Sequence, residues 1–267
     1  MTTFELYNAN CLVKMKELPD KSVDLIICDL PYGCLTTGKG KEKLQRADNP
    51  EKPNDRETGL IVGCAWDIKI NLDEFWKQVK RIRKDDHTPC IHFCNTKFGN
   101  DLINSNPDEF RYDLVWNKMR GVGFLSVNKK PMSSHEMLYI FSKKGAKYNR
   151  IDIAGEPYTH KKSNTKTKVY NTENVLTTNT GTRCVLSVID ESSFAKKDQH
   201  PTAKPDELYR WLISRYSNAG GLVLDPTFGS CNSGAVAREL GRNYIGIEMN
   251  KDFFDKAVER LLPPINA

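Results

Sequence analysis

The sequence Asp-Leu-Pro-Tyr-Gly at positions 29–33 contains residue types that can activate a weakly nucleophilic amine. The exocyclic amine of a nucleobase is a poor nucleophile because its lone pair is delocalised into the ring. The Asp29 carboxylate and the carbonyl of Leu30 or Pro31 can accept hydrogen bonds from its N–H groups and help it to become pyramidal. Proline fixes φ and can hold such a carbonyl in place, while Tyr32 can stack on a base extruded from a duplex. The alternative interpretation of this motif is purely structural, namely a proline turn with a packed tyrosine.

A second group of chemically useful residues lies near the C-terminal end of the sequence. Asp225 closes the apolar run GLVLD, the small-residue turn PTFGSCNSG follows, and Glu248 closes the next apolar run. Such a turn lets a ligand approach the backbone, and an acid closing the next strand can accept hydrogen bonds from ribose hydroxyls. The turn is neither GxGxxG nor GxxxxGK(S/T), which disfavours a dinucleotide site and a P-loop. The acidic strand ends suit a positively charged cofactor such as S-adenosylmethionine, although a tight turn without a ligand remains the alternative.

Apolar runs typical of buried strands alternate with helical periodicity along the chain. The strand-like runs cover residues 4–7, 23–30, 88–95, 112–118, 135–144, 221–227 and 243–250, and the helical runs cover 71–84, 206–218, 233–240 and 251–262. This alternation predicts a mostly parallel sheet with helices on both faces. Ligands bind at the carboxyl ends of the strands in such sheets. We therefore expect Asp29 to lie beside a pocket formed by residues 225–230 and Glu248.

Length and composition narrow the class of protein. The chain has 267 residues, of which 39% are hydrophobic and 28% charged, and this suits one α/β domain. It contains no apolar run long enough for a membrane span, and its N-terminal residues lack the pattern of a secretory signal. The eight cysteines are scattered without a CxxC pair. We therefore expect reduced structural thiols, a cytoplasmic setting and no metal.

The positive charge of the chain is concentrated in one stretch. Residues 142–204 contain twelve basic and six acidic residues, so their excess equals the net charge of +6 of the whole chain. A basic, polar segment of this kind is typical of binding to a polyanion, but a solvated loop explains it equally well. A second polar stretch, residues 34–63, predicts a long loop that either closes over the catalytic tetrapeptide or is a passive insertion.

The two motifs together resemble those of the DNA amino-methyltransferases. That family has a catalytic motif (D/N/S)PP(Y/F) and a cofactor motif similar to DPFxGSGTT, which stand here as DLPY and DPTFGSCNS. The catalytic motif comes first, as in the permuted beta class. Similarity extends to the N-terminal block YNANCLVKMKELPDKSVDLIICDLPYG and to several short segments. These segments are Trp66-Asp67, Trp116-Asn117-Lys118, His135-Glu136 and HPTAKP at 200–205.

The resemblance implies an architecture as well as an activity. It implies an α/β, Rossmann-like fold of the S-adenosylmethionine-dependent methyltransferases, with a mostly parallel, doubly wound sheet in a circularly permuted order. The whole chain would form a single methyltransferase domain. Within it, residues 1–144 would form the catalytic half, 145–199 a target-recognition segment and 200–267 the cofactor-binding half. The expected partner is double-stranded DNA in a bacterial or phage-infected cell, while a homodimer and a partner restriction nuclease are left open.

The resemblance also assigns roles to individual positions. It implies three catalytic residues, seven that bind S-adenosylmethionine and no metal ligand, and the basic segment adds four lysines expected to contact phosphates. The catalytic residues are Asp29, Pro31 and Tyr32, the cofactor-binding residues are Asn10, Lys204, Asp225, Phe228, Gly229, Ser230 and Glu248, and the lysines are Lys161, Lys162, Lys166 and Lys168. The sequence departs from the family pattern at Leu30, Cys231 and Asn232-Ser233, and Asn10 stands where many members have aspartate.

The motif favours one substrate over another. Aspartate in the tetrapeptide favours N6 of adenine, since members that methylate N4 of cytosine more often have serine there. N4-cytosine methylation is the nearest alternative. A non-catalytic nucleic-acid-binding protein with the same fold is an alternative from another class, which the intact Asp29 and Glu248 argue against. Methylation of RNA or protein is a lesser alternative.

Overall fold

The computed structural model describes residues 2–33, 69–162, 165–166, 171–172, 175–192 and 203–261. The chain divides into two compact units. The sheet unit comprises residues 1–148 and 188–267, and the inserted unit comprises residues 149–187. The loop predicted for residues 34–63 and the pair Trp66-Asp67 lie outside the described residues. Among the helices that are described, none is long and apolar enough to cross a membrane.

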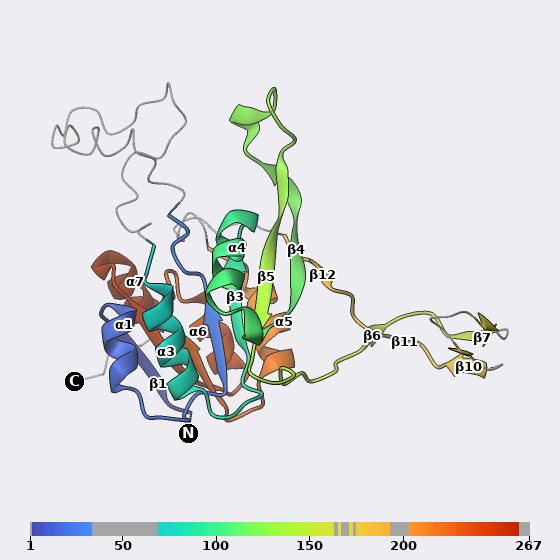
Figure 1. The fold of residues 1–267 in the computed structure, drawn as a ribbon, viewed down its shortest axis with the longest axis horizontal. Coiled ribbons are helices and arrows are strands. Elements are labelled where there is room, and N and C mark those ends of the chain that lie inside the picture. Colours follow the sequence, from blue (N-terminus) through green and yellow to red (C-terminus); the bar gives the residue numbers. More distant parts are fainter. Residues whose placement is uncertain are drawn as a thin grey trace. The chain divides into compact units, whose positions relative to one another are not determined.

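An eight-stranded sheet forms the centre of the sheet unit (Figure 1). Its strands, in spatial order, are β1 (Phe4–Asn8), β14 (Asn243–Glu248), β13 (Leu222–Asp225), β2 (Leu25–Cys28), β3 (Cys90–Cys94), β5 (Ser133–Phe141), β4 (Phe110–Val122) and β12 (Val188–Asp190). Neighbouring strands are parallel from β1 to β3. Strand β5 is antiparallel to both β3 and β4, and β12 is parallel to β4. The mostly parallel α/β sheet predicted from the sequence is confirmed.

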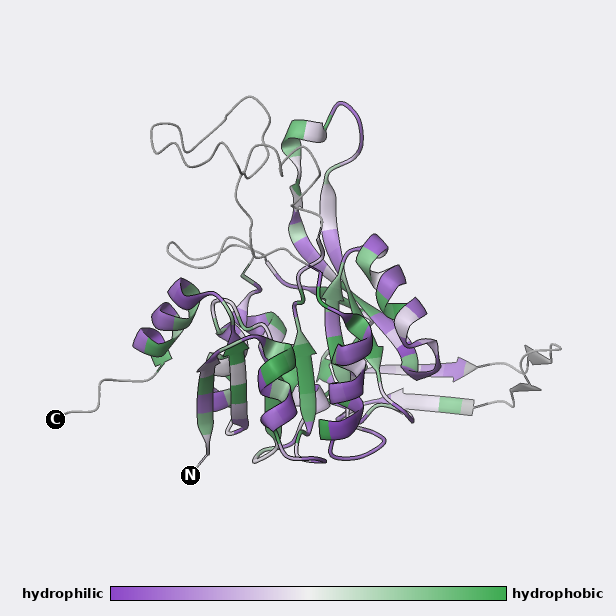
Figure 2. Ribbon diagram, turned by 60° about the vertical axis from the view of Figure 1, so that its left-hand side comes forward, coloured by the Kyte–Doolittle hydropathy of each residue, from purple (hydrophilic) through white to green (hydrophobic). Residues whose placement is uncertain are grey.

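Helices cover the two faces of this sheet because alternate residues of its buried strands point to opposite sides. Leu25 and Ile27 of β2 belong to one apolar cluster, and Ile26 and Cys28 belong to the other. The first cluster includes buried residues of α5 (Asp206–Tyr216), α6 (Asn232–Glu239) and α7 (Lys251–Leu261), and the second those of α1 (Cys11–Lys14), α3 (Leu72–Ile82) and α4 (Thr96–Ser105). Figure 2 shows the hydrophobic sheet strands between helices whose outer sides are hydrophilic. The sheet is therefore doubly wound, as predicted.

Within the sheet unit, helices α1 and α4 and strand β12 were not predicted. Helix α1 has four residues and β12 has three, too few for a periodic pattern to be visible. Helix α4 follows β3 directly, capped by the Asn95 side chain, which accepts a hydrogen bond from the Phe98 amide. Its apolar stripe is short, because Phe98 and Leu102 are its only buried large apolar residues. Neighbouring structure, rather than a strong local pattern, defines these elements.

Strands β4 and β5 continue beyond the rest of the sheet as a hairpin (Figure 1). Asn117 pairs with His135, and Val122 pairs with Ser133. The register shifts between these two pairs, which indicates a β-bulge or a similar irregularity. Met119, within the irregularity, has a φ of 58°, and bulges of this kind bend a strand and increase its twist. The short helical turn η3 (Phe124–Ser126) forms the tip. The predicted strands 112–118 and 135–144 cover only the base of this hairpin.

The inserted unit consists of three short antiparallel strand pairs. They are β6 (Ile153–Ala154) with β11 (Thr182–Arg183), β7 (Tyr158–Lys162) with β10 (Val175–Asn179), and β8 (Thr165–Lys166) with β9 (Asn171–Thr172). No strands were predicted here, because strands of two to five residues are too short to show a clear alternating pattern. Lys161 and Lys162 lie on β7 and Lys166 on β8, whereas Lys168 lies outside the described residues.

Candidate active site

Three acidic residues stand at the ends of three neighbouring strands. Asp29 follows β2, Asp225 ends β13, and Glu248 ends β14. Strand β13 pairs with both β2 and β14, and all three are parallel, so the acids meet at one edge of the sheet. This is the edge at which parallel α/β sheets bind ligands. The structure therefore brings position 29 beside residues 225–230 and 248.

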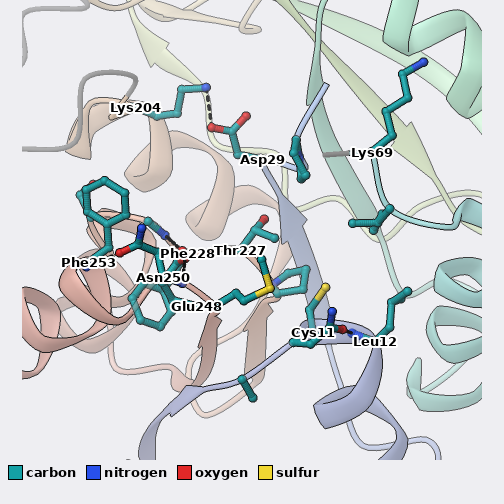
Figure 3. A pocket seen from close by; sticks show the side chains of 18 of the residues that line it. Cys11, Leu12, Asp29, Lys69, Lys204, Thr227, Phe228, Glu248, Asn250 and Phe253 are labelled. Atoms are coloured by element: carbon teal, nitrogen blue, oxygen red, sulfur yellow. Dashed lines mark hydrogen bonds and ion pairs between the residues drawn. The ribbon is translucent and has the colours of Figure 1, made fainter. Parts of the chain in front are cut away.

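A cavity of about 630 Å³ opens at this edge (Figure 3). Eight of the ten predicted catalytic and cofactor-binding residues line it, namely Asn10, Asp29, Pro31, Lys204, Phe228, Gly229, Ser230 and Glu248. Tyr32 and Asp225 do not line it. Residues that the sequence analysis did not single out complete the wall, among them Leu12, Lys69, Ile70, Thr227, Met249, Asn250 and Phe253. Met249, Asn250 and Phe253 could have been predicted, because they follow strand β14, which ends at the same edge of the sheet.

Glu248 is held by backbone groups on both sides of its carboxylate. One oxygen accepts a hydrogen bond from the Gly229 amide at 2.9 Å, and the other accepts one from the Asn250 amide at 2.7 Å. Gly229 has a φ of 53°, a conformation that glycine adopts without strain. Burial raises the pKa of Glu248 above its usual value. The carboxylate is thus fixed in orientation, and each oxygen keeps a lone pair for a ligand hydroxyl.

Asp225 lies beneath the cavity rather than on its wall. Its side chain is buried and accepts hydrogen bonds from the Ser233 hydroxyl at 2.6 Å and the Thr227 amide at 3.1 Å. Burial raises the pKa of Asp225 to about 7. The following turn ends at Cys231, a non-glycine residue with a φ of 57° that stands where the family has glycine. Asp225 therefore shapes the turn that borders the cavity.

Substitution of Asp225 by asparagine is expected to stabilise the folded protein at high pH. The pKa of Asp225 is about 7 when folded and 3.8 ordinarily, so its contribution to stability is fully present below pH 3.8 and is lost as the pH rises through 7. The Asp225→Asn variant keeps the hydrogen-bonding shape but does not titrate. Its advantage in free energy of unfolding should be largest above pH 7, should shrink between pH 7 and 3.8, and should vanish below. Urea unfolding across this range measures it, and an advantage independent of pH would contradict the assignment.

The Asp29 carboxylate is anchored through both oxygens. One accepts a hydrogen bond from the Lys204 ammonium at 2.7 Å, and the other accepts one from the Tyr32 hydroxyl at 3.0 Å. The Tyr32 hydroxyl also lies 3.1 Å from a Glu136 oxygen. Burial, then the charges of Asp29 and Glu136, raise the pKa of Tyr32 well above its usual value, so the hydroxyl remains a donor. The orientation of Asp29 is therefore set by the neighbouring Tyr32 and by Lys204, which is far away in the sequence.

Lys204 and Lys118 balance the charges of Asp29 and Glu136. The Lys204 ammonium is 3.7 Å from Glu136, and the Lys118 ammonium is 3.2 Å from it. Burial tends to lower the pKa of Lys204, but Asp29 and Glu136 more than offset this and raise it. Burial tends to raise the pKa of Glu136, but Lys204 and Lys118 lower it. Lys204 and Glu136 therefore stabilise each other's charged forms, and Lys204, predicted to be a cofactor-proximal residue, binds Asp29 directly.

Three potential metal ligands lie together away from the cavity. Donor atoms of the buried residues Cys28, Cys90 and His92 lie within 4.8 Å of one another, and this is the only such set among the residues described. The His92 ring packs edge-on against Phe75 and Phe141 in the apolar core. Closed zinc sites normally have four ligands and a polar second shell. We therefore interpret the set as core packing and assign no metal to it.

Comparisons with known proteins agree with this geometry. A family model described as a DNA methylase, N6_N4_Mtase, matches residues 23–259. The type II methyltransferase M.HinfI of Haemophilus influenzae is 30% identical over 267 residues, which cover 96% of this chain and 67% of that protein.

Two solved structures share the fold at low sequence identity. The structure of the M1.HpyAVI–SAM complex has a TM-score of 0.57 and 20% identity, and the match covers 97% of this chain and all of that one. The cytosine-N4-specific PvuII DNA methyltransferase has a TM-score of 0.65 and 16% identity, and the match covers 100% of this chain and 89% of that one.

The match to the family model spans most of the chain and includes both strand-end motifs. The chain therefore belongs to the N6_N4_Mtase family of DNA amino-methyltransferases.

Proposed function

We propose that this protein transfers the methyl group of S-adenosylmethionine to N6 of an adenine extruded from double-stranded DNA. Family membership establishes a DNA amino-methyltransferase and leaves N6-adenine and N4-cytosine open. The observation that carries the proposal is the position of Asp29 in the wall of the same cavity as Glu248. A group that can orient an amine and a group that can hold a nucleoside hydroxyl thus face one enclosed space.

The cavity suits S-adenosylmethionine in size and charge. Its volume of about 630 Å³ falls within the range of small-molecule sites. The carboxyl groups of Asp29 and Glu248 line the cavity, which favours a ligand with a sulfonium and an ammonium group. Glu248 would accept hydrogen bonds from the ribose, and Gly229 and Ser230 would lie against the methionine part. When bound, S-adenosylmethionine supplies an electrophilic methyl group.

Asp29 and the adjoining backbone would prepare the amine for in-line attack. The Asp29 carboxylate accepts a hydrogen bond from one N–H group, and a carbonyl of the Leu30–Pro31 segment accepts one from the other. The amine lone pair then points at the methyl group. No covalent enzyme intermediate and no metal are required, since the leaving group departs as a neutral thioether. Positioning of this kind can lower a barrier by roughly 7–11 kcal/mol.

Tyr32 has a different setting from the one that the sequence suggests. One face of its ring stacks on Phe98, with ring centroids 5.1 Å apart, so an extruded base would stack on the opposite face. Its hydroxyl is committed to Asp29 and Glu136. We therefore assign Tyr32 two roles, to hold Asp29 in position and to present one ring face to the base.

The choice between adenine and cytosine is tested by the product. Purified protein, tritium-labelled S-adenosylmethionine and plasmid DNA are incubated, and the DNA is digested to nucleosides. We expect the label in N6-methyladenine, because aspartate at position 29 is typical of members acting on adenine. Label in N4-methylcytosine would contradict the adenine assignment. If calorimetry detected no binding of S-adenosylmethionine, the non-catalytic alternative would replace the enzymatic one.

Residues 145–199 are proposed to recognise the target sequence. This range includes the whole inserted unit. It contains nine basic and six acidic residues, so it carries half of the net charge of +6 of the chain. Lys161 is exposed on β7, and we propose that it contacts phosphates together with Lys162, Lys166 and Lys168. Phosphate contacts position a protein on DNA without specifying sequence. Exchange of this range for that of a relative should change the methylated sites mapped in a plasmid.

A further inference from the structure

The tip of the β4–β5 hairpin carries large apolar side chains that are exposed among the described residues of the sheet unit. Phe124 is 73% exposed and Leu125 is 81% exposed, and Met119 nearby is 61% exposed. Figure 2 shows the turn at the tip as hydrophobic. A two-stranded hairpin has little stability of its own in water. Apolar groups at the end of such an arm therefore indicate a surface that contacts another molecule.

The hairpin arises at the catalytic edge of the sheet. Strand β5 is antiparallel to β3, so its beginning lies where β2 and β3 end. Glu136 stands in β5 close to this beginning and shares the Tyr32 hydroxyl with Asp29. Lys118 of β4 pairs with Glu136. The arm thus continues directly from the residues that hold Asp29, and the last five residues of β4 carry the chain from Asn117 to Val122, a reach of at most roughly 16 Å.

The charge of the arm favours a polyanion as its partner. Residues 119–134 contain three basic residues and no acidic residue. Of these, Lys129 and Lys130 are exposed and lie between η3 and β5, a few residues after Phe124. A second protein copy with the same charge would be repelled by this arm, whereas a nucleic-acid duplex would be attracted.

We infer that the arm, residues 119–132, enters a groove of the duplex, where Phe124 and Leu125 contact bases and Lys129 and Lys130 contact the flanking phosphates. The major groove of B-DNA, roughly 12 Å wide, admits a two-stranded β-ribbon. Apolar side chains contact thymine methyl groups and base faces favourably but gain nothing from phosphates, so the apolar tip belongs among the bases. These residues belong to the sheet unit and not to the inserted unit. The inference rests on the proposed action on DNA duplexes.

Duplex binding by the full-length protein separates the two kinds of contact. The probe is a fluorescein-labelled DNA duplex of mixed sequence, followed by anisotropy over a series of salt concentrations. The double variant Phe124→Ala/Leu125→Ala should weaken binding by about 10- to 150-fold, the equivalent of about 1.5–3 kcal/mol for a large apolar side chain that is no longer buried against the bases. Its salt dependence should be unchanged. The double variant Lys129→Ala/Lys130→Ala should instead reduce the slope of log K against log salt by about 0.9 for each lost phosphate contact.

Controls keep folding and catalysis apart from this surface. Val188→Ala removes an exposed apolar side chain of the edge strand β12, 50% exposed, and should bind DNA as the wild type does. Calorimetry with S-adenosylmethionine should give wild-type affinity for every variant. Failure of methyl transfer in the wild type would contradict the proposed function, yet the duplex-binding result would still stand.

Two results would overturn the inference. The first is wild-type duplex affinity in the Phe124→Ala/Leu125→Ala variant. The second is a change of that variant from dimer to monomer in sedimentation at unaltered duplex affinity, which would make the tip an interface between copies of the chain.

Discussion

Replacement of Asp29 by alanine is expected to abolish measurable methyl transfer while leaving the binding of S-adenosylmethionine largely intact. The Asp29 carboxylate is the acceptor that orients the amine, and removal of a positioned group of this kind lowers kcat by roughly 10²- to 10⁴-fold. We propose that cofactor binding depends mainly on Glu248 and the turn at Gly229, whose mutual hydrogen bond the substitution does not touch. Single-turnover transfer to plasmid DNA and calorimetry with the cofactor measure the two quantities. Full methylation by this variant would refute the catalytic assignment.

The same substitution has a structural effect that must be measured beside it. Lys204 is 5% exposed, and without Asp29 its nearest carboxylate is that of Glu136 at 3.7 Å. A buried charge that loses a partner destabilises the fold, so the melting temperature of Asp29→Ala should fall. Asp29→Asn keeps the shape and removes the charge, and should be equally inactive. Inactivity in both variants at temperatures well below melting assigns the loss to chemistry rather than to unfolding.

Replacement of Lys204 by methionine should produce the second largest loss, and its pH dependence should reveal the reason. Methionine keeps much of the buried volume but removes the ammonium that binds Asp29 and lowers the pKa of Glu136. An opposite charge nearby lowers the pKa of a carboxyl group. The acidic limb of the kcat profile should therefore move to higher pH. Activity lost at neutral pH should partly return as the pH rises.

Two comparisons separate this positioning role from a cofactor-binding role. Lys204→Arg retains a positive charge and should recover part of the activity with a nearly normal pH profile. Calorimetry with S-adenosylmethionine should show a much smaller change than kcat in both variants. If Lys204→Met instead weakened cofactor binding as strongly as it lowered kcat, with the pH profile unmoved, the residue would belong to the cofactor site alone.

The strand ends of the site could be predicted from the sequence, because local patterns define them. The apolar runs before Asp29, Asp225 and Glu248 are typical of strands buried on both faces. Parallel strands in a doubly wound sheet present their carboxyl ends at one edge. Asp29, Glu248 and the turn at 228–230 accordingly line one cavity, whereas Asn10 and Lys204, which also line it, were implied by the resemblance. Asp225 is different, since a residue that ends a buried central strand can point below the cavity as easily as into it.

The network around Asp29 could not be predicted in the same way. Lys204 is 175 positions away from Asp29 in the chain, and Glu136 is more than a hundred positions away. The sequence around each of them does not indicate which residue it contacts. Resemblance identified the segments that contain them but not their contacts. The hairpin tip was missed for another reason. Its exposed apolar residues follow no period of a buried strand, because they do not face the core of the sheet unit.

Strand β5 reverses the direction of the sheet between β3 and β4, and this reversal leaves room for variation in length. A parallel connection must cross over the sheet, whereas β4 and β5 connect directly at the catalytic edge. Residues can therefore be added to or removed from the tip in matched pairs without moving Glu136 or the strands that hold Asp29. Within this architecture, the depth to which the arm reaches can be altered independently of the chemistry at its base.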